Sequence, residues 1–241
     1  MQILYVSMIA PYRWRRPLWL EQTMNCDAVI FDLDGTLLDT LDDIAASANR
    51  ALVSNGFPPH MREAYRWFVG DGSAVLMTRA LPENHRDPET SRQCLEAFIT
   101  DYSDNWKTAT RPYEGMLTLL ARLQDRNIQL SVVTNKPHQF TGVMMAHYFR
   151  DYEFGPVLGQ QEGIPRKPSP HQALTAAKQM EVAPSSCIFI GDSAVDMQTA
   201  RNARMHPVGA GWGFRPAAEL LEAGAEVVLN RPLELLDLLD R

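Results

Sequence analysis

The chain has 241 residues, 45% of them hydrophobic and 22% charged, which is typical of a globular protein with enough apolar material for a core. Its net charge of −6 and its pI near 5.5 argue against a protein whose main task is to bind the phosphate backbone of nucleic acids. The three widely spaced cysteines and six scattered histidines lack the spacing of a disulfide framework or a zinc site. We therefore expect reduced core thiols and no nucleic-acid partner.

Residues 1–23 differ from the rest of the chain. A weakly apolar segment, Ile3 to Ala10, precedes the basic residues Arg13, Arg15 and Arg16, which is the reverse of the order in a secretory signal. We interpret residues 1–23 as an extension that is disordered or non-native, with Met24 as the true start; contact with a membrane is the alternative. No apolar run approaches the roughly 20 residues of a membrane helix, so we expect no membrane partner. We further expect a cytoplasmic protein that is a monomer or a homodimer.

Short apolar runs alternate with helical patterns along most of the remaining chain. The first run, Ala28–Phe31, suits a strand that is covered on both faces. Further strands are predicted at residues 128–133, 187–190, 206–209 and 226–229. Helices are predicted at 112–125, 137–149, 170–180, 193–203 and 216–223, several of them opening with proline and one with Ser193 as a plausible N-cap. This alternation predicts an α/β fold with a Rossmann-like, doubly wound parallel sheet.

One segment breaks the alternation, because residues 40–111 show helical patterns and no convincing strand. Apolar residues recur there at helical spacing, first at Leu41, Ile44, Ala48 and Leu52, and later within 64–69, 73–81 and 88–106. We predict that 40–111 form an inserted all-helical cap domain. The α/β core domain would then consist of residues 24–39 and 112–241.

Polar residues follow several of the predicted strands at the point where each strand ends. In open parallel sheets, ligands bind outside these carboxyl ends. Each such residue alone is most simply a turn, strand-end or surface residue. Carboxylates, a hydroxyl, an amide and a lysine at one rim together favour a nucleophile, a metal site and phosphate ligands. The residues concerned are Asp32, Asp34, Thr134, Asn135, Lys167, Asp192 and Asp196.

Four segments resemble the four motifs of the haloacid dehalogenase-like hydrolase superfamily. Asp32-x-Asp34-Gly35-Thr36 is similar to the first motif and Thr134-Asn135 to the second. Lys167-Pro168 is similar to the third, and Gly191-Asp192-Ser193-x-x-Asp196 to the fourth. The motifs occur in order and at strand ends, and the resemblance extends from Asp27 to Leu239.

The resemblance implies phosphoryl transfer through an aspartyl-phosphate. Asp32 would be the nucleophile and Asp34 the general acid and base; dehalogenases of the superfamily lack an aspartate at the second position. Mg²⁺ would be held by Asp32, the backbone carbonyl of Asp34 and Asp192, with Asp196 in or near the shell behind these ligands. The oxygens of the phosphoryl group would be bound by Thr134, Asn135 and Lys167.

The helical insert resembles the cap of the phosphoglycolate phosphatase and β-phosphoglucomutase branch. The segments 69–72, 134–137 and 211–216 favour phosphoglycolate phosphatase. This implies 2-phosphoglycolate as the substrate, contacted by Gly72 and Ser73 at a helix start that Ser73 would cap. Arg79 is either a second anchor for the substrate or a surface residue. Gly70 and Gly72 alternatively serve only to separate two helices, and Asp71 departs from the asparagine that is common in related caps.

Other functions fit the same motifs. The substrate can be another small phosphorylated metabolite, such as a sugar phosphate or pyrophosphate. The chain can also be a β-phosphoglucomutase-like phosphomutase, or a catalytically idle binding module on the same fold. The presence of Asp32, Asp34, Lys167 and Asp192 argues against an idle site. Release of phosphate from an aryl phosphate would separate these alternatives.

Overall fold

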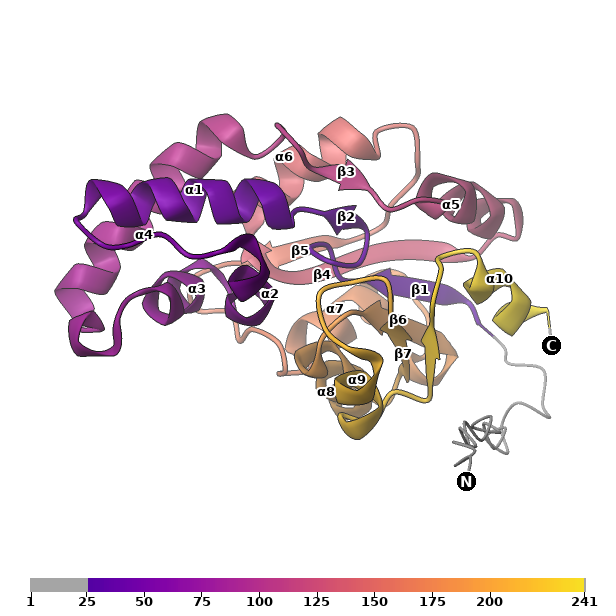
Figure 1. The fold of residues 1–241 in the computed structure, drawn as a ribbon. Coiled ribbons are helices and arrows are strands. Elements are labelled where there is room, and N and C mark those ends of the chain that lie inside the picture. Colours follow the sequence, from indigo (N-terminus) through magenta and orange to yellow (C-terminus); the bar gives the residue numbers. More distant parts are fainter. Residues whose placement is uncertain (1–25, 241) are drawn as a thin grey trace, which may run out of the picture.

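A six-stranded parallel sheet forms the centre of the computed structural model, which describes residues 26–240 (Figure 1). The strand order is β5-β4-β1-β6-β7-β8, so that β1 lies between β4 and β6. The predicted doubly wound α/β fold is therefore confirmed. The strands are β1 (Ala28–Phe31), β4 (Gln129–Pro137), β5 (Val157–Gln160), β6 (Cys187–Gly191), β7 (His206–Ala210) and β8 (Val227–Leu229).

Helices cover both faces of the sheet, since its strands are apolar on both sides. Val29 and Phe31 of β1 pack into one core cluster with α5, α6 and α10, whereas Ala28 and Ile30 pack into another with α7 and α8. Side chains that alternate along a strand thus supply both cores. These helices are α5 (Met116–Asp125), α6 (His138–Tyr148), α7 (His171–Gln179), α8 (Ala194–Asn202), α9 (Ala217–Glu222) and α10 (Glu234–Leu239).

The observed elements differ from the predicted ones at several boundaries. β5 and α10 were not predicted, and β4 runs on to Pro137, four residues beyond its predicted end. Pro112 belongs to a short strand rather than to a helix, and α5 begins only at Met116, after the left-handed Gly115. Ser193 does precede α8 and forms a capping box with Asp196, as its position in the sequence indicated.

The segment from residue 41 to residue 105 is helical and gathers at one end of the molecule (Figure 1). Its apolar cluster also takes in Phe140 and Phe214 from the α/β part, so the two parts share one interior. The domain bounds 40–111 stay a prediction, and the extension 1–23 lies outside the described residues. None of the helices within 26–240 is long and apolar enough to cross a membrane. The helices of this segment are α1 (Leu41–Ser54), α2 (Tyr65–Phe68), α3 (Ser73–Ala80) and α4 (Pro88–Asn105), with short 3₁₀ turns at Arg62–Ala64 and Glu83–His85.

A two-stranded antiparallel ribbon joins this helical segment to the sheet. It pairs β2 (Leu38–Asp39) with β3 (Arg111–Pro112), so residue 111 is a strand residue where only helix was expected. Beside the ribbon, the buried carboxylate of Asp43 accepts hydrogen bonds from the backbone N–H groups of Ala109 and Thr110 and from the Thr110 hydroxyl, at 2.7–3.0 Å. The carboxylate therefore fixes the returning chain against the first turn of α1.

We expect Asp43→Ala to lower the free energy of unfolding by about 3 kcal/mol, because it leaves buried donors without their charged acceptor. For a chain of this size, the midpoint of thermal unfolding should fall by about 6–12 °C. Asp42→Ala is the matched control, since Asp42 pairs with Arg62 at the surface and should contribute less than about 1 kcal/mol. Equal losses in the two variants would contradict the role given to Asp43.

Candidate active site

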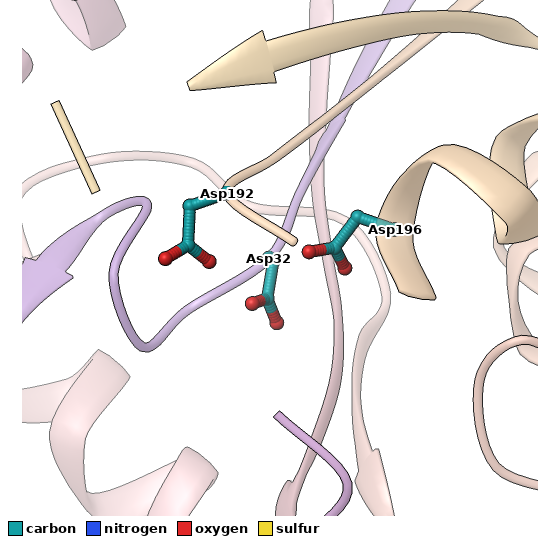
Figure 2. Close-up of side chains that lie close together, drawn as sticks. All are labelled: Asp32, Asp192 and Asp196. Atoms are coloured by element: carbon teal, nitrogen blue, oxygen red, sulfur yellow. The ribbon is translucent and has the colours of Figure 1, made fainter. Parts of the chain in front are cut away.

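The residues predicted for the site converge at the carboxyl ends of the central strands. Asp32 follows β1, Thr134 and Asn135 lie near the end of β4, and Asp192 follows β6. Asp196 projects from the first turn of α8 toward the other two carboxylates (Figure 2). Because these three strands are neighbours in the sheet, their ends bring together residues that are up to 160 positions apart.

Three buried carboxylates form the centre of this site. Asp32, Asp192 and Asp196 each place a carboxylate oxygen within 4.8 Å of the other two (Figure 2). Burial, together with the nearby carboxylates of Asp196 and Asp32, raises the pKa of Asp192 well above its usual value. Burial also raises the pKa of Asp196, although Lys167 counteracts the shift. The cluster thus holds negative charge that its protein surroundings do not fully offset.

Lys167 is the cation of this cluster. Its Nζ atom lies 2.7 Å from Asp32 Oδ1 and 2.7 Å from Asp196 Oδ1, and only 4% of the residue is exposed. Burial opposes the charge of the ammonium group, but the carboxylates of Asp196 and Asp32 outweigh it and raise the pKa of Lys167. The lysine is therefore charged and directed at the predicted nucleophile.

The donor set fits a hard divalent cation. Among residues 26–240, carboxylates supply every ligand of the candidate metal cluster, and Mg²⁺ prefers such oxygen ligands. The four aspartates at positions 32, 34, 192 and 196 face two lysines, Lys136 and Lys167, which leaves two negative charges to be offset. Asp192 Oδ2 accepts a hydrogen bond from the Phe214 N–H group at 2.7 Å, which fixes the orientation of the carboxylate. The cluster is thus suited to a divalent cation, whereas the assignment of Asp32 and Asp192 as ligands with Asp196 behind them stays a prediction.

Glycines enclose Asp192. A Cβ atom at Gly35 or Gly213 would collide with the Asp192 side chain, and one at Gly191 would collide with Asp196. Gly35 also has a φ of 83°, a conformation that favours glycine. The loop after β1 and the loop after β7 can therefore close around the carboxylates only because these positions lack side chains.

A second ion pair was not predicted from the sequence. Lys136, at the end of β4, places its Nζ atom 2.9 and 3.0 Å from the two carboxylate oxygens of Asp34 and 3.0 Å from the Tyr102 hydroxyl. The sequence included Lys136 in the segment 134–137, which resembles the second motif of phosphoglycolate phosphatases, but gave no indication that it pairs with Asp34. Tyr102 gave no signal, because it lies on α4 and reaches the site only through the packing of the helical segment.

The Asn135 side chain joins the helical segment to the Lys167 loop. Its Nδ2 group donates to the carbonyls of Gly70, at 3.0 Å, and Lys167, at 3.1 Å, and its Oδ1 accepts from the Lys167 N–H group at 2.9 Å. Both amide hydrogens are thereby used, so phosphate binding by this side chain stays a prediction. The Thr134 hydroxyl accepts from the Lys136 N–H group at 3.2 Å and borders the cavity over the site.

The loop before α3 borders the same cavity. Gly70, Gly72 and Ser73 all line it. Gly72 and Ser73 are the two residues that were predicted to contact the substrate. The prediction that Ser73 caps α3 is wrong, because Gly72 is the N-cap residue and Ser73 is the first residue of the helix. Asp71 does not line the cavity; its carboxylate pairs with Arg79 at 2.6 Å, which offsets its charge.

The cavity lies between the sheet and the helical segment. Its volume is about 40 Å³, room for about three water molecules. Its walls come from both parts of the chain. Of the predicted site residues of the α/β part, Lys167 and Asp196 do not line it, whereas the other five do, namely Asp32, Asp34, Thr134, Asn135 and Asp192. The apolar part of the lining comprises Ile44, Val69, Leu76, Phe98, Pro137, Phe140 and Phe214, and Arg215 adds a cation.

Comparison with known proteins assigns the chain to a family. The family model described as haloacid dehalogenase-like hydrolase matches residues 29–210, which include all four motifs and the three carboxylates. The chain belongs to this family. The predicted resemblance is confirmed, and so is the prediction of an enzyme that hydrolyses phosphoric monoesters.

Individual relatives carry more specific names. The N-acetylmuramic acid 6-phosphate phosphatase of Pseudomonas aeruginosa is 32% identical over 220 residues, covering 90% of this chain and 96% of that protein. The phosphoglycolate phosphatase of Pseudomonas putida is 34% identical over 190 residues, covering 77% of this chain and 70% of that protein. A crystal structure of a candidate phosphoglycolate phosphatase from Lactobacillus delbrueckii subsp. bulgaricus matches with a TM-score of 0.85 and 32% identity, over 90% of this chain and 99% of the other.

The raised pKa of Asp192 leads to a prediction about metal-free protein. A carboxyl group with a raised pKa stabilises the fold at low pH, and this contribution is lost as pH rises from its unfolded value, near 3.9, through its folded value. In a chelator at pH 8, Asp192→Asn should therefore unfold at a higher temperature than the wild type, by about 2–4 °C for each kcal/mol relieved. Asparagine keeps an acceptor for the Phe214 N–H group.

Mg²⁺ should raise the unfolding temperature of the wild type and have much less effect on Asp192→Asn. The exposed Asp237→Asn serves as the control and should behave as the wild type with and without Mg²⁺. A metal-free Asp192→Asn that unfolds below the wild type at pH 8 would contradict this account of the cluster.

Proposed function

We propose that the protein hydrolyses a small phosphomonoester with Mg²⁺ through an aspartyl-phosphate on Asp32. The observation that carries the proposal is the position of Asp32, which lies beside a buried lysine and two further carboxylates and borders the cavity. A carboxylate repels an anionic phosphoryl group, so attack requires positive charge on both partners. Lys167 supplies one such charge 2.7 Å from Asp32.

The reaction has two steps on this chain. First, an oxygen of Asp32 forms a bond to phosphorus, the bond from phosphorus to the ester oxygen breaks, and Asp34 gives a proton to the leaving oxygen. Then Asp34 takes a proton from water as the water oxygen bonds to phosphorus and the bond to Asp32 breaks. The products are an alcohol and inorganic phosphate, and both aspartates return to their starting forms.

The other residues of the site bind and orient the substrate. Lys167 and the Thr134 hydroxyl lie beside the position of the phosphoryl oxygens, and the Asn135 amide keeps the Lys167 loop in place. When Mg²⁺ is bound by Asp32, Asp192 and the Asp34 carbonyl, it offsets the charge that the phosphoryl group brings. The small volume of the cavity limits the amount of water beside the reacting atoms.

Asp32→Asn should fold normally and lose at least about a thousandfold in kcat, because an amide cannot attack phosphorus as a carboxylate does. Release of inorganic phosphate from an aryl phosphate with Mg²⁺ is the measurement. Asp27→Asn is the control, since Asp27 is an exposed aspartate at the opposite end of the same strand. Turnover near that of the wild type in Asp32→Asn would refute the mechanism, and full activity in a chelator would refute the role of the metal.

For the substrate, we propose 2-phosphoglycolate. The cavity of about 40 Å³ is smaller than any phosphomonoester, so the helical segment must move outward to admit the substrate, and a substrate with a very small remainder requires the smallest movement. The start of α3 and the Arg215 side chain border the cavity and are suited to hold a carboxylate. Several relatives named phosphoglycolate phosphatase support this choice.

N-acetylmuramic acid 6-phosphate is the second candidate, because a relative with that activity in its name matches over 96% of its length. Both candidates are phosphorylated carboxylic acids. The larger one requires the helical segment to move further outward than 2-phosphoglycolate does, since it carries a sugar ring in addition. Other sugar phosphates and pyrophosphate are further alternatives, and a phosphomutase would transfer the phosphoryl group without releasing phosphate.

We expect kcat/KM to be higher for 2-phosphoglycolate than for N-acetylmuramic acid 6-phosphate, hexose phosphates and pyrophosphate. Gly72→Val should lower kcat/KM for 2-phosphoglycolate by about tenfold to a hundredfold, because its Cβ would lie 3.2 Å from the Asn135 carbonyl and displace the loop. Gly56→Val is the matched control, since Gly56 also has a positive φ but a Cβ atom there would have no neighbour within 4 Å. If 2-phosphoglycolate ranks low, or both valine variants act alike, this substrate assignment fails while the hydrolysis of phosphomonoesters stands.

A further inference from the structure

Lys136 is a buried lysine to which the two reaction steps above give no task. It is 6% exposed, and burying an ammonium group is unfavourable unless the group is paired. The structure offers its three hydrogens three acceptors, namely the two Asp34 oxygens and the Tyr102 hydroxyl. Burial opposes its charge, but Asp34 and Tyr102 outweigh burial and raise its pKa. Lys136 is thus a fixed positive charge between two parts of the chain.

The ion pair determines how Asp34 is oriented. Asp34 follows β1 in a loop, where its backbone forms only an isolated bridge to Leu38. Both of its carboxylate oxygens lie at nearly equal distances from one nitrogen, 2.9 and 3.0 Å, which fixes the direction of the carboxylate plane. With both oxygens in contact with the ammonium group, Asp34 is a carboxylate, the form that takes a proton from the attacking water in the second step, so this direction matters for proton transfer.

Tyr102 connects this ion pair to the helical segment. It lies on α4, where its ring stacks on Phe98 at 5.3 Å and meets the edge of Phe140 at 5.2 Å. The Lys136 ammonium lies 4.7 Å from the centre of the same ring, so the tyrosine contacts it through both its hydroxyl and its π face. Tyr102 can make these contacts only while α4 lies against the sheet.

We infer that Lys136 is a positioning residue that orients Asp34 for proton transfer, and that Tyr102 keeps Lys136 in place while the helical segment covers the site. Proton transfer is thereby coupled to closure of the site. The inference rests on the proposed function, because it presupposes that Asp34 is the acid and base. A lysine that served only to offset buried charge would affect stability, and it would affect all substrates alike.

Two substrates distinguish these roles. An alkyl phosphate such as 2-phosphoglycolate has a poor leaving group, so breaking its bond to phosphorus depends on a proton from Asp34. In 2,4-dinitrophenyl phosphate the leaving group departs as a stable anion, so the first step needs little proton donation. The burst of dinitrophenol that accompanies formation of the aspartyl-phosphate reports this first step alone. If 2-phosphoglycolate is not turned over, the best alkyl phosphate of the substrate panel replaces it.

The experiment compares Lys136→Met, Lys136→Arg and Tyr102→Phe with the wild type. Lys136→Met should lower kcat for the alkyl phosphate about a hundredfold, with KM within about twofold of the wild type. The burst rate with the aryl phosphate should fall less than about fivefold. Lys136→Arg should recover most of kcat, because it keeps the charge. Tyr102→Phe should lower kcat about fivefold, and this effect should disappear in the Lys136→Met background.

Two matched variants serve as controls. Lys107→Met removes an exposed lysine of the helical segment, and Tyr148→Phe removes a tyrosine hydroxyl that donates to the Thr110 carbonyl at 2.9 Å. Both should leave kcat for the two substrates unchanged. Equal losses with the alkyl and aryl phosphates in Lys136→Met, or a raised KM with unchanged kcat, would overturn the inference. If Lys136→Met does not fold, Tyr102→Phe provides the comparison, and it should lower kcat for the alkyl phosphate more than the burst rate with the aryl phosphate.

Asp34→Asn separates this inference from the proposed function. If Asp34→Asn turns over the alkyl phosphate as the wild type does, the acid–base role of Asp34 fails and the proposed mechanism fails with it. If Asp34→Asn is inactive while Lys136→Met is close to the wild type, only the positioning role of Lys136 is refuted.

Discussion

Four carboxylates lie at the carboxyl ends of two adjacent strands, and three of them are almost wholly removed from water. Negative charge in such a place must be offset locally, since the protein interior screens it far less than solvent does. Lys167 lies between Asp32 and Asp196, and Lys136 faces Asp34, but Asp192 has no cation of its own among the described residues. The negative charge that remains makes the site suitable for a divalent cation. The bound cation in turn makes the site suitable for an anionic substrate.

The arrangement of the chain follows from this constraint. A parallel sheet collects the strand ends at one edge, and the helical segment covers that edge and excludes water (Figure 1). The contacts between the two parts are polar near the reacting atoms and apolar around them. Asn135 holds the Gly70 carbonyl, Lys136 holds the Tyr102 hydroxyl, and Phe140 and Phe214 join the apolar cluster of the helices. The same few residues therefore determine the charge of the site, the shape of the cavity over it and the access to that cavity.

Much of this was accessible from the sequence, for a physical reason. The central strands are apolar on both faces, so β1 and β6 could be recognised in the sequence as apolar runs. The polar residues that follow these runs indicated the site. β5 did not stand out, because it is a four-residue edge strand that contains a glycine. The pairing of Lys136 with Tyr102 could not be predicted, since it depends on how α4 packs against the sheet. The helical segment from residue 73 was predicted, but its N-cap was assigned to Ser73 because serine is the commoner N-cap; the N-cap is Gly72, which has a φ of 89°.

The glycines around the carboxylates have a consequence for how this protein tolerates change. At positions 35, 191 and 213, even a methyl group would occupy space that Asp192 or Asp196 already fills. Alanine, usually the mildest substitution, therefore creates a steric clash at these positions. A ranking of positions by the chemical reactivity of their side chains would not include these glycines. In a saturating mutational scan, the least replaceable positions of this pocket would include those that contribute no functional group at all.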